Sequence, residues 1–157
     1  GLAHALAVAG NDAGALRTYE SALADPVMRD RLSYSWYPTR IGIAEVANWI
    51  ALRRAAGKSY SAELAAMKAT MERFRAGGVA LPSIDYQSAV LAMLEDDEAA
   101  ARAALERAIA RGWLELVVLD TDVAWRTVAG RPWFVAAKQE IAERVGAERE
   151  RAEIPAR

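Results

Sequence analysis

Two stretches of the chain, GNDAGALRTYESAL (10–23) and DDEAAARAALERAI (96–109), carry the same pattern of small and large residues. An alanine is followed four residues later by a large apolar residue, and three residues further on by a second alanine. The residues of this pattern are Ala15, Tyr19 and Ala22 in the first stretch and Ala101, Leu105 and Ala108 in the second. Residues three and four apart share one face of a helix, and small side chains on that face let another helix approach closely. The pattern therefore predicts helices paired as antiparallel hairpins.

The rest of the chain has the same helical character. Apolar residues recur at intervals of three and four almost throughout, and alanine, a strong helix former, is abundant. Turn-forming residues at Gly10, Gly57 and Asp96 each fall inside a candidate hairpin. Pro132 suits the first position of a last helix. We expect an all-α fold of about three hairpins and a terminal capping helix, forming one domain over residues 1–157, with a charged tail at 147–157 that frays.

The spacing of small residues resembles the second helix of a tetratricopeptide (TPR) repeat. A third candidate repeat has Gly57 as its turn and Ala62 as its small residue, although the intervals exceed the 34 residues of the family. The resemblance implies an α-α solenoid whose hairpins stack into a right-handed superhelix. It also implies that the first helix of each pair lines the concave face.

The stretches LERAIARGW (105–113) and LDTDVAWRTVAGRPWF (119–134) resemble the C-terminal end of bacterial tetratricopeptide proteins. The matching residues are Asp120, Asp122, Trp125, Pro132 and Phe134. The resemblance implies that these residues close one end of the solenoid rather than form a catalytic site. Since the helical pattern is already present at Gly1, we expect this chain to be part of a longer array.

Composition and charge argue against several classes of partner. Twenty Lys and Arg residues balance 21 Asp and Glu residues, for a net charge of −1, so nothing favours nucleic acid or an anionic membrane. No apolar run approaches the ~18 residues of a membrane span, and no signal peptide is visible, which favours a cytoplasmic location. The tryptophans lack the interleaved basic residues of a base-stacking surface, and we expect them to fill the core. They are Trp36, Trp49, Trp113, Trp125 and Trp133.

Catalytic and metal chemistry also find little support, and we expect no enzyme activity, no cofactor and no metal. His4 is the only histidine, and the chain has no cysteine, whereas a zinc site needs three or four N, S or O ligands. No GxSxG stretch is present for a hydroxyl nucleophile. For Asp120 and Asp122 we favour helix capping or turn hydrogen bonds over a cation site or catalysis.

Projection from the three turns places six residues on the concave face: His4, Asn48, Arg54, Tyr86, Gln87 and Met93. Their polar groups suit the backbone or a carboxylate of an extended peptide. We therefore expect a protein-interaction or scaffolding domain that binds a peptide or a neighbouring domain. The double substitution of Asn48 and Arg54 to alanine is expected to weaken capture while lowering the melting temperature little. The alternative is a regulatory or structural segment of a larger protein that packs intramolecularly or self-associates.

Overall fold

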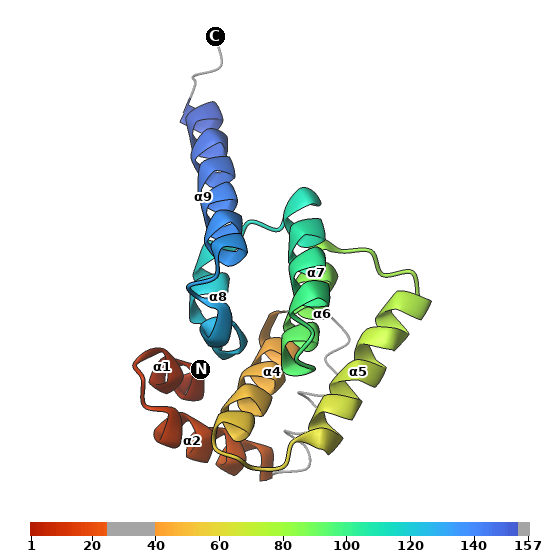
Figure 1. Ribbon diagram of the computed structural model, residues 1–157, viewed down its shortest axis with the longest axis vertical. Helices are drawn as coiled ribbons and strands as arrows, with labels where there is room; N and C mark the ends of the chain where they lie inside the picture. Colours follow the sequence, from red (N-terminus) through yellow and green to blue (C-terminus); the bar gives the residue numbers. More distant parts are fainter. Residues whose placement is uncertain (25–39, 154–157) are drawn as a thin grey trace.

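The computed structural model describes residues 1–24 and 40–153, and within them every regular element is a helix. The sequence-based prediction of an all-α chain is confirmed for this part of the molecule (Figure 1). The α-helices are α1 (Leu2–Val8), α2 (Asp12–Ala24), α4 (Arg40–Ala55), α5 (Ser61–Ala76), α6 (Pro82–Leu94), α7 (Glu98–Ala110), α8 (Leu116–Thr121) and α9 (Pro132–Glu153). A 3₁₀ helix, η1 (Val123–Val128), lies between α8 and α9.

Three tight turns join consecutive helices at the positions expected from the sequence. Gly10, Gly57 and Asp96 have φ angles of +78°, +66° and +63°, which is the left-handed region. At each turn, two backbone N–H groups donate to carbonyls of the preceding helix, as Gly10 does to Ala7 and Asn11 to Leu6. This arrangement satisfies carbonyls that a helix end leaves free. Asp96 tolerates the left-handed conformation better than most non-glycine residues, since its side chain is short and polar.

The helix pairs are α1 with α2, α4 with α5, and α6 with α7. The contact between α6 and α7 is the most extensive, and Ala101, Ala104 and Ala108 of α7 are buried, as close packing of the pair requires. In α2, Ala15 and Tyr19 are buried as the pattern predicts, but Ala22 is exposed and Leu23 is buried in its place. The small-residue pattern thus holds fully in α7 and in part in α2.

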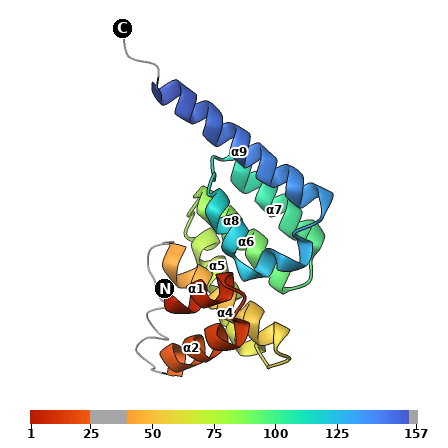
Figure 2. The same cartoon turned by 90° about the vertical axis from the view of Figure 1, so that its left-hand side faces the viewer.

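The pairs lie side by side, with α4 in the middle. Helix α4 packs against α2 on one side and against α6 on the other, and it also contacts α5 (Figures 1 and 2). Ile50 and Leu52 of α4 are buried. Helix α6 is the most enclosed element, since its residues from 86 to 94 are all buried.

The C-terminal part of the chain folds back over the helix pairs. Helix η1 packs against α4 and α6, and the first part of α9 packs against α7 and α8. Helix α9 continues through Gly146 to Glu153, so residues 147–153 are helical in the structure, and the fraying of this tail stays a prediction. Its last turns extend beyond the other helices (Figure 2). Residues 154–157 lie outside the described part of the chain. So does Trp36, which we expected in the core.

Candidate functional site

Four of the six residues predicted for an open groove are buried. The exposed fractions of Asn48, Tyr86, Gln87 and Met93 are 8% or less. The expectation that these side chains offer a free peptide-binding surface is therefore not met. Asn48 and Tyr86 do face a common space, as projected, but another part of the same chain fills it. We call this part, residues 122–128, the closing segment.

Asn48 holds the start of the closing segment with both ends of its amide. Its Nδ2 donates a hydrogen bond to Oδ1 of Asp122 at 3.1 Å. Its Oδ1 accepts a hydrogen bond from the backbone N–H of Val123 at 2.7 Å. A carboxylate and a backbone N–H are the two groups that the sequence analysis assigned to a bound peptide. Here they come from residues 74 and 75 positions further along the same chain.

Tyr86 holds the same segment from the side of α6. Its hydroxyl donates to Oδ2 of Asp122 and accepts a hydrogen bond from Nε1 of Trp125 at 3.0 Å. The Tyr86 ring also stacks on Trp113, with ring centroids 3.9 Å apart and planes 10° from parallel. Each polar atom that these residues bring into the core therefore has a partner, as buried polar groups require.

Burial dominates the electrostatics of this network. It raises the pKa of Asp122, although hydrogen bonds from Tyr86 and Asn48 and the charge of His4 act in the opposite direction. The nearby carboxylate of Glu45 raises the pKa of Asp122 further. Burial, together with the charge of Asp122 and its hydrogen bond, raises the pKa of Tyr86 well above its usual range. Both oxygens of Asp122 are engaged, so the arrangement fits a structural joint better than acid–base chemistry.

Asp122 does not cap a helix through its side chain, contrary to the interpretation that we favoured from the sequence. It occupies the N-cap position of η1, yet its carboxylate makes no capping hydrogen bond there. Asp120 forms an ion pair with Lys138 of α9 instead. Asp97, by contrast, accepts a hydrogen bond from the N–H of Ala100 at 2.9 Å and caps α7.

The other end of the closing segment reaches the first helix pair. Arg126 donates to both carboxylate oxygens of Asp12 at 2.8 and 2.9 Å, and to the carbonyl of Ala7. The closing segment thus contacts α1, α2, α4 and α6 together.

The remaining predicted residues have different surroundings. Arg54 donates to the carbonyl of Met93 at 3.2 Å and pairs with Asp96, which ties α4 to the turn after α6. His4 is half-buried in α1, and Oε1 of Gln87 is buried without a hydrogen-bond partner. The structure brings Asn48 and Tyr86 together through Asp122, but it does not unite all six residues in one site.

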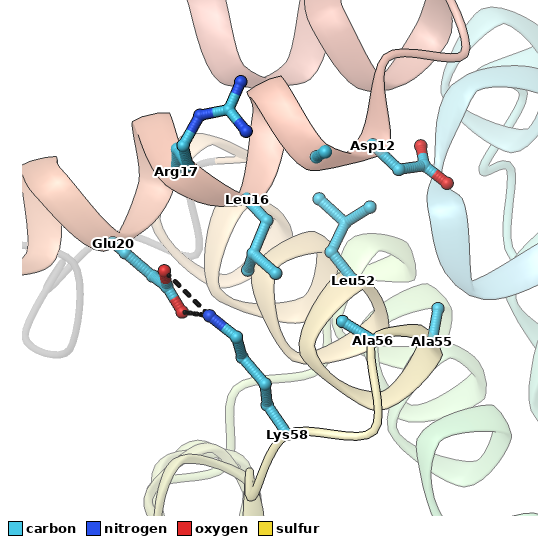
Figure 3. Close-up of a pocket in the computed structure, with 9 residues that line it drawn as sticks. Asp12, Leu16, Arg17, Glu20, Leu52, Ala55, Ala56 and Lys58 are labelled. Atoms are coloured by element: carbon cyan, nitrogen blue, oxygen red, sulfur yellow. Dashed lines mark hydrogen bonds and ion pairs between the residues drawn. The ribbon is translucent and has the colours of Figure 1, made fainter.

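A hollow that remains open lies between α2 and the end of α4 (Figure 3). It has a volume of about 370 Å³, and we call it the α2–α4 pocket. Its lining residues are Asp12, Ala13, Leu16, Arg17, Glu20, Leu52, Ala55, Ala56 and Lys58. Leu16 and Leu52 lie beside each other in Figure 3. The rest of the apolar lining is the small side chains of Ala13, Ala55 and Ala56. The sequence did not predict this pocket, because the identity of an exposed alanine does not indicate whether it borders a pocket or a flat surface.

The charged residues around the α2–α4 pocket differ in whether they form an ion pair. Nζ of Lys58 pairs with both carboxylate oxygens of Glu20, at 2.8 and 3.1 Å, and Asp12 pairs with Arg126. Arg17 is exposed and forms no ion pair with any residue in the described ranges. In Figure 3 its guanidinium group is turned away from the Glu20–Lys58 pair.

A second hollow, of about 510 Å³, borders the start of α5 and includes Tyr60 and Leu64. Its two charged residues, Lys68 and Glu95, pair with each other at 2.6 Å. It therefore has no unpaired charge with which to select a ligand.

Comparisons with known proteins found no match: no family model, no curated protein and no solved structure matches this chain. Within residues 1–24 and 40–153, no group of three or more His, Asp or Glu side chains is placed to hold a metal ion. No helix among the described residues is both long enough and apolar enough to cross a membrane.

Proposed function

We propose that this chain is a non-catalytic protein-interaction domain built from stacked, tetratricopeptide-like helix pairs that wind as a right-handed superhelix. Three consecutive pairs with the same left-handed turns, at Gly10, Gly57 and Asp96, support this arrangement. The packing of α4 against both α2 and α6 is what stacked pairs require.

The observation that carries the proposal is the α2–α4 pocket. Protein interfaces obtain most of their affinity from a few side chains that enter well-packed pockets. Leu16 and Leu52 form an apolar floor, while Ala13, Ala55 and Ala56 are exposed and leave room for an incoming side chain. The face predicted from the sequence is covered by the closing segment, so an external partner must bind elsewhere.

The second candidate is a structural or regulatory function. In this case the face with Asn48 and Tyr86 binds a segment of the same chain and no external partner. The hold of Asn48 and Tyr86 on Asp122 favours it, because these residues bind a segment of this chain with the chemistry expected for a partner peptide. This reading predicts that the α2–α4 pocket binds nothing.

Peptide selection on the full chain separates the two functions. We would select a displayed library of random 12-residue peptides on the immobilised chain and measure binding of the enriched sequences by fluorescence anisotropy. A pocket-filling variant, Ala13→Gln with Ala55→Gln, adds two long side chains to exposed positions of the pocket. The matched control, Ala69→Gln with Ala110→Gln, makes the same change at exposed helix positions elsewhere.

The interaction proposal predicts that the pocket-filling variant weakens binding by about tenfold, or roughly 1.4 kcal/mol. The control variant should bind within about twofold of the original chain, and both variants should melt at its temperature. If no peptide is enriched, or if enriched peptides bind the pocket-filling variant unchanged, the α2–α4 pocket is not the interaction site and the structural reading is favoured.

A further inference from the structure

The charges around the α2–α4 pocket indicate what kind of partner it selects. The carboxylates of Asp12 and Glu20 and the ammonium of Lys58 are each neutralised by a residue of this chain. Arg17 is the one lining charge without such a partner among the described residues. A planar guanidinium group binds a carboxylate through two parallel hydrogen bonds, so the unbalanced charge favours an acidic group on the partner.

The floor of the pocket adds a second requirement. Leu16 and Leu52 are buried at 7% and 2% exposure, while the alanines beside them stay exposed. An apolar side chain that enters the pocket covers mainly the exposed alanines beside this floor, and removing their apolar surface from water is favourable in proportion to the area covered. The volume of about 370 Å³ lies near the lower end of ligand pockets, about 300–1,000 Å³, so the pocket suits an anchoring side chain better than a large cofactor.

We propose that the α2–α4 pocket binds an acidic segment of another protein, in which an apolar side chain rests on Leu16 and Leu52 and a nearby carboxylate pairs with Arg17. This inference rests on the proposed interaction function and specifies its ligand. A singly charged carboxylate suits the site better than a phosphate group, because Arg17 is the one unpaired lining charge among the described residues and the second charge of a phosphate would find no free partner there.

The test uses the full chain and the peptides enriched by the selection described above. Each enriched peptide is compared with a form in which its Asp and Glu residues are replaced by Asn and Gln, and with a form in which its acidic residue is replaced by phosphoserine. Arg17→Glu reverses the charge at the pocket. Arg149→Glu, at an exposed position near the end of α9, makes the same change in net charge far along the chain and is the matched control.

A second variant tests the same charge without removing Arg17. Ala13→Glu places a carboxylate in the first turn of α2, four residues before Arg17, where the helix dipole favours it and where it can pair with that arginine. Ala13→Gln is its neutral counterpart of nearly the same size. The difference in affinity between these two variants isolates the charge from the loss of space.

We expect the acidic peptides to bind Arg17→Glu roughly 3- to 30-fold more weakly than the original chain, since an attraction is lost and a repulsion is gained. Arg149→Glu should stay within about twofold, and Ala13→Glu should bind more weakly than Ala13→Gln. The deficit should shrink between 0.05 and 0.5 M NaCl because salt screens exposed charges. The neutral peptides should bind the original chain and Arg17→Glu alike.

The two proposals fail in different ways. If filling the pocket abolishes binding but Arg17→Glu does not change it, the interaction function stands and the acidic ligand is wrong. Tighter binding of the phosphoserine peptides than of the carboxylate peptides would also overturn the carboxylate assignment. If no binding depends on the pocket, both proposals fail.

Discussion

Asn48 and Asp122 lie 74 residues apart in the chain and meet in its interior, where Nδ2 of Asn48 donates to Oδ1 of Asp122 at 3.1 Å. The same amide accepts the N–H of Val123, so one side chain of α4 fixes both a carboxylate and the adjacent backbone. An asparagine so placed binds a carboxylate together with the backbone next to it. That the bound segment belongs to the same chain changes the expected effect of mutating this residue.

Asn48→Ala should destabilise the fold. It leaves a carboxylate oxygen of Asp122 and the N–H of Val123 unpaired in a buried place, at a cost of about 2–4 kcal/mol. For a chain of this size the melting temperature should fall by roughly 5–15 °C, measured by circular dichroism. Gln139→Ala, at an exposed position of α9, should leave it unchanged. This expectation replaces the sequence-based one of a nearly constant melting temperature, and a shift of only a degree or two for Asn48→Ala would restore that earlier view.

The raised pKa of Asp122 predicts a definite pH dependence. Because the folded pKa lies above the unfolded value, the group stabilises the fold fully below the unfolded pKa, and this contribution is lost as the pH rises through the folded pKa. Asp122→Asn cannot ionise, so its free energy of unfolding relative to the original chain should improve between pH 4 and pH 8. Urea unfolding at several pH values measures the difference, with Glu150→Gln on exposed α9 as a control for net charge. A difference that stays constant or moves the other way would contradict the burial of an ionisable Asp122.

Close packing between α6 and α7 predicts intolerance of larger side chains. Ala108 has 0% exposure, so Ala108→Leu forces extra volume into a filled contact and should cost about 1–3 kcal/mol or more. Ala110→Leu, two residues further on at an exposed position, should change stability by less than about 0.5 kcal/mol. Equal effects of the two substitutions in urea unfolding would mean that small residues are not needed at this contact.

Removal of residues 147–157 should barely affect stability. The side chains from 147 to 152 are exposed, so the truncation should change the free energy of unfolding by less than about 1 kcal/mol while reducing the helical signal in circular dichroism. A fall of several degrees in melting temperature would show that the end of α9 has contacts beyond those described above.

The sequence predicted those parts of the fold that depend on local pattern. The alanines of α7 and the turns at Gly10, Gly57 and Asp96 mark hairpins, since the turn conformation and helical faces are set by residues close in sequence. The projection from the turns also placed Asn48 and Tyr86 in one groove, and in the structure both side chains contact Asp122.

That the closing segment fills this groove could not be predicted from the sequence. The hydrogen bonds of Asn48 join residues 74 and 75 positions apart, and helical periodicity has no information on such distant contacts. Asp122 looked like a capping residue because aspartate before a helix usually is one. The α2–α4 pocket depends on the distance between two helices. The residue types of Ala13 and Ala55 give no information on that distance.

Amide hydrogen exchange at Val123 most directly tests the claim that the chain fills its own groove. The N–H of Val123 donates to Oδ1 of Asn48 at 2.7 Å and can exchange only when the closing segment detaches. We predict that it exchanges about as slowly as the buried backbone of α6 near Val90, and much faster in Asn48→Ala. Exchange of Val123 in the original chain as fast as that of the exposed end of α9 would contradict the account.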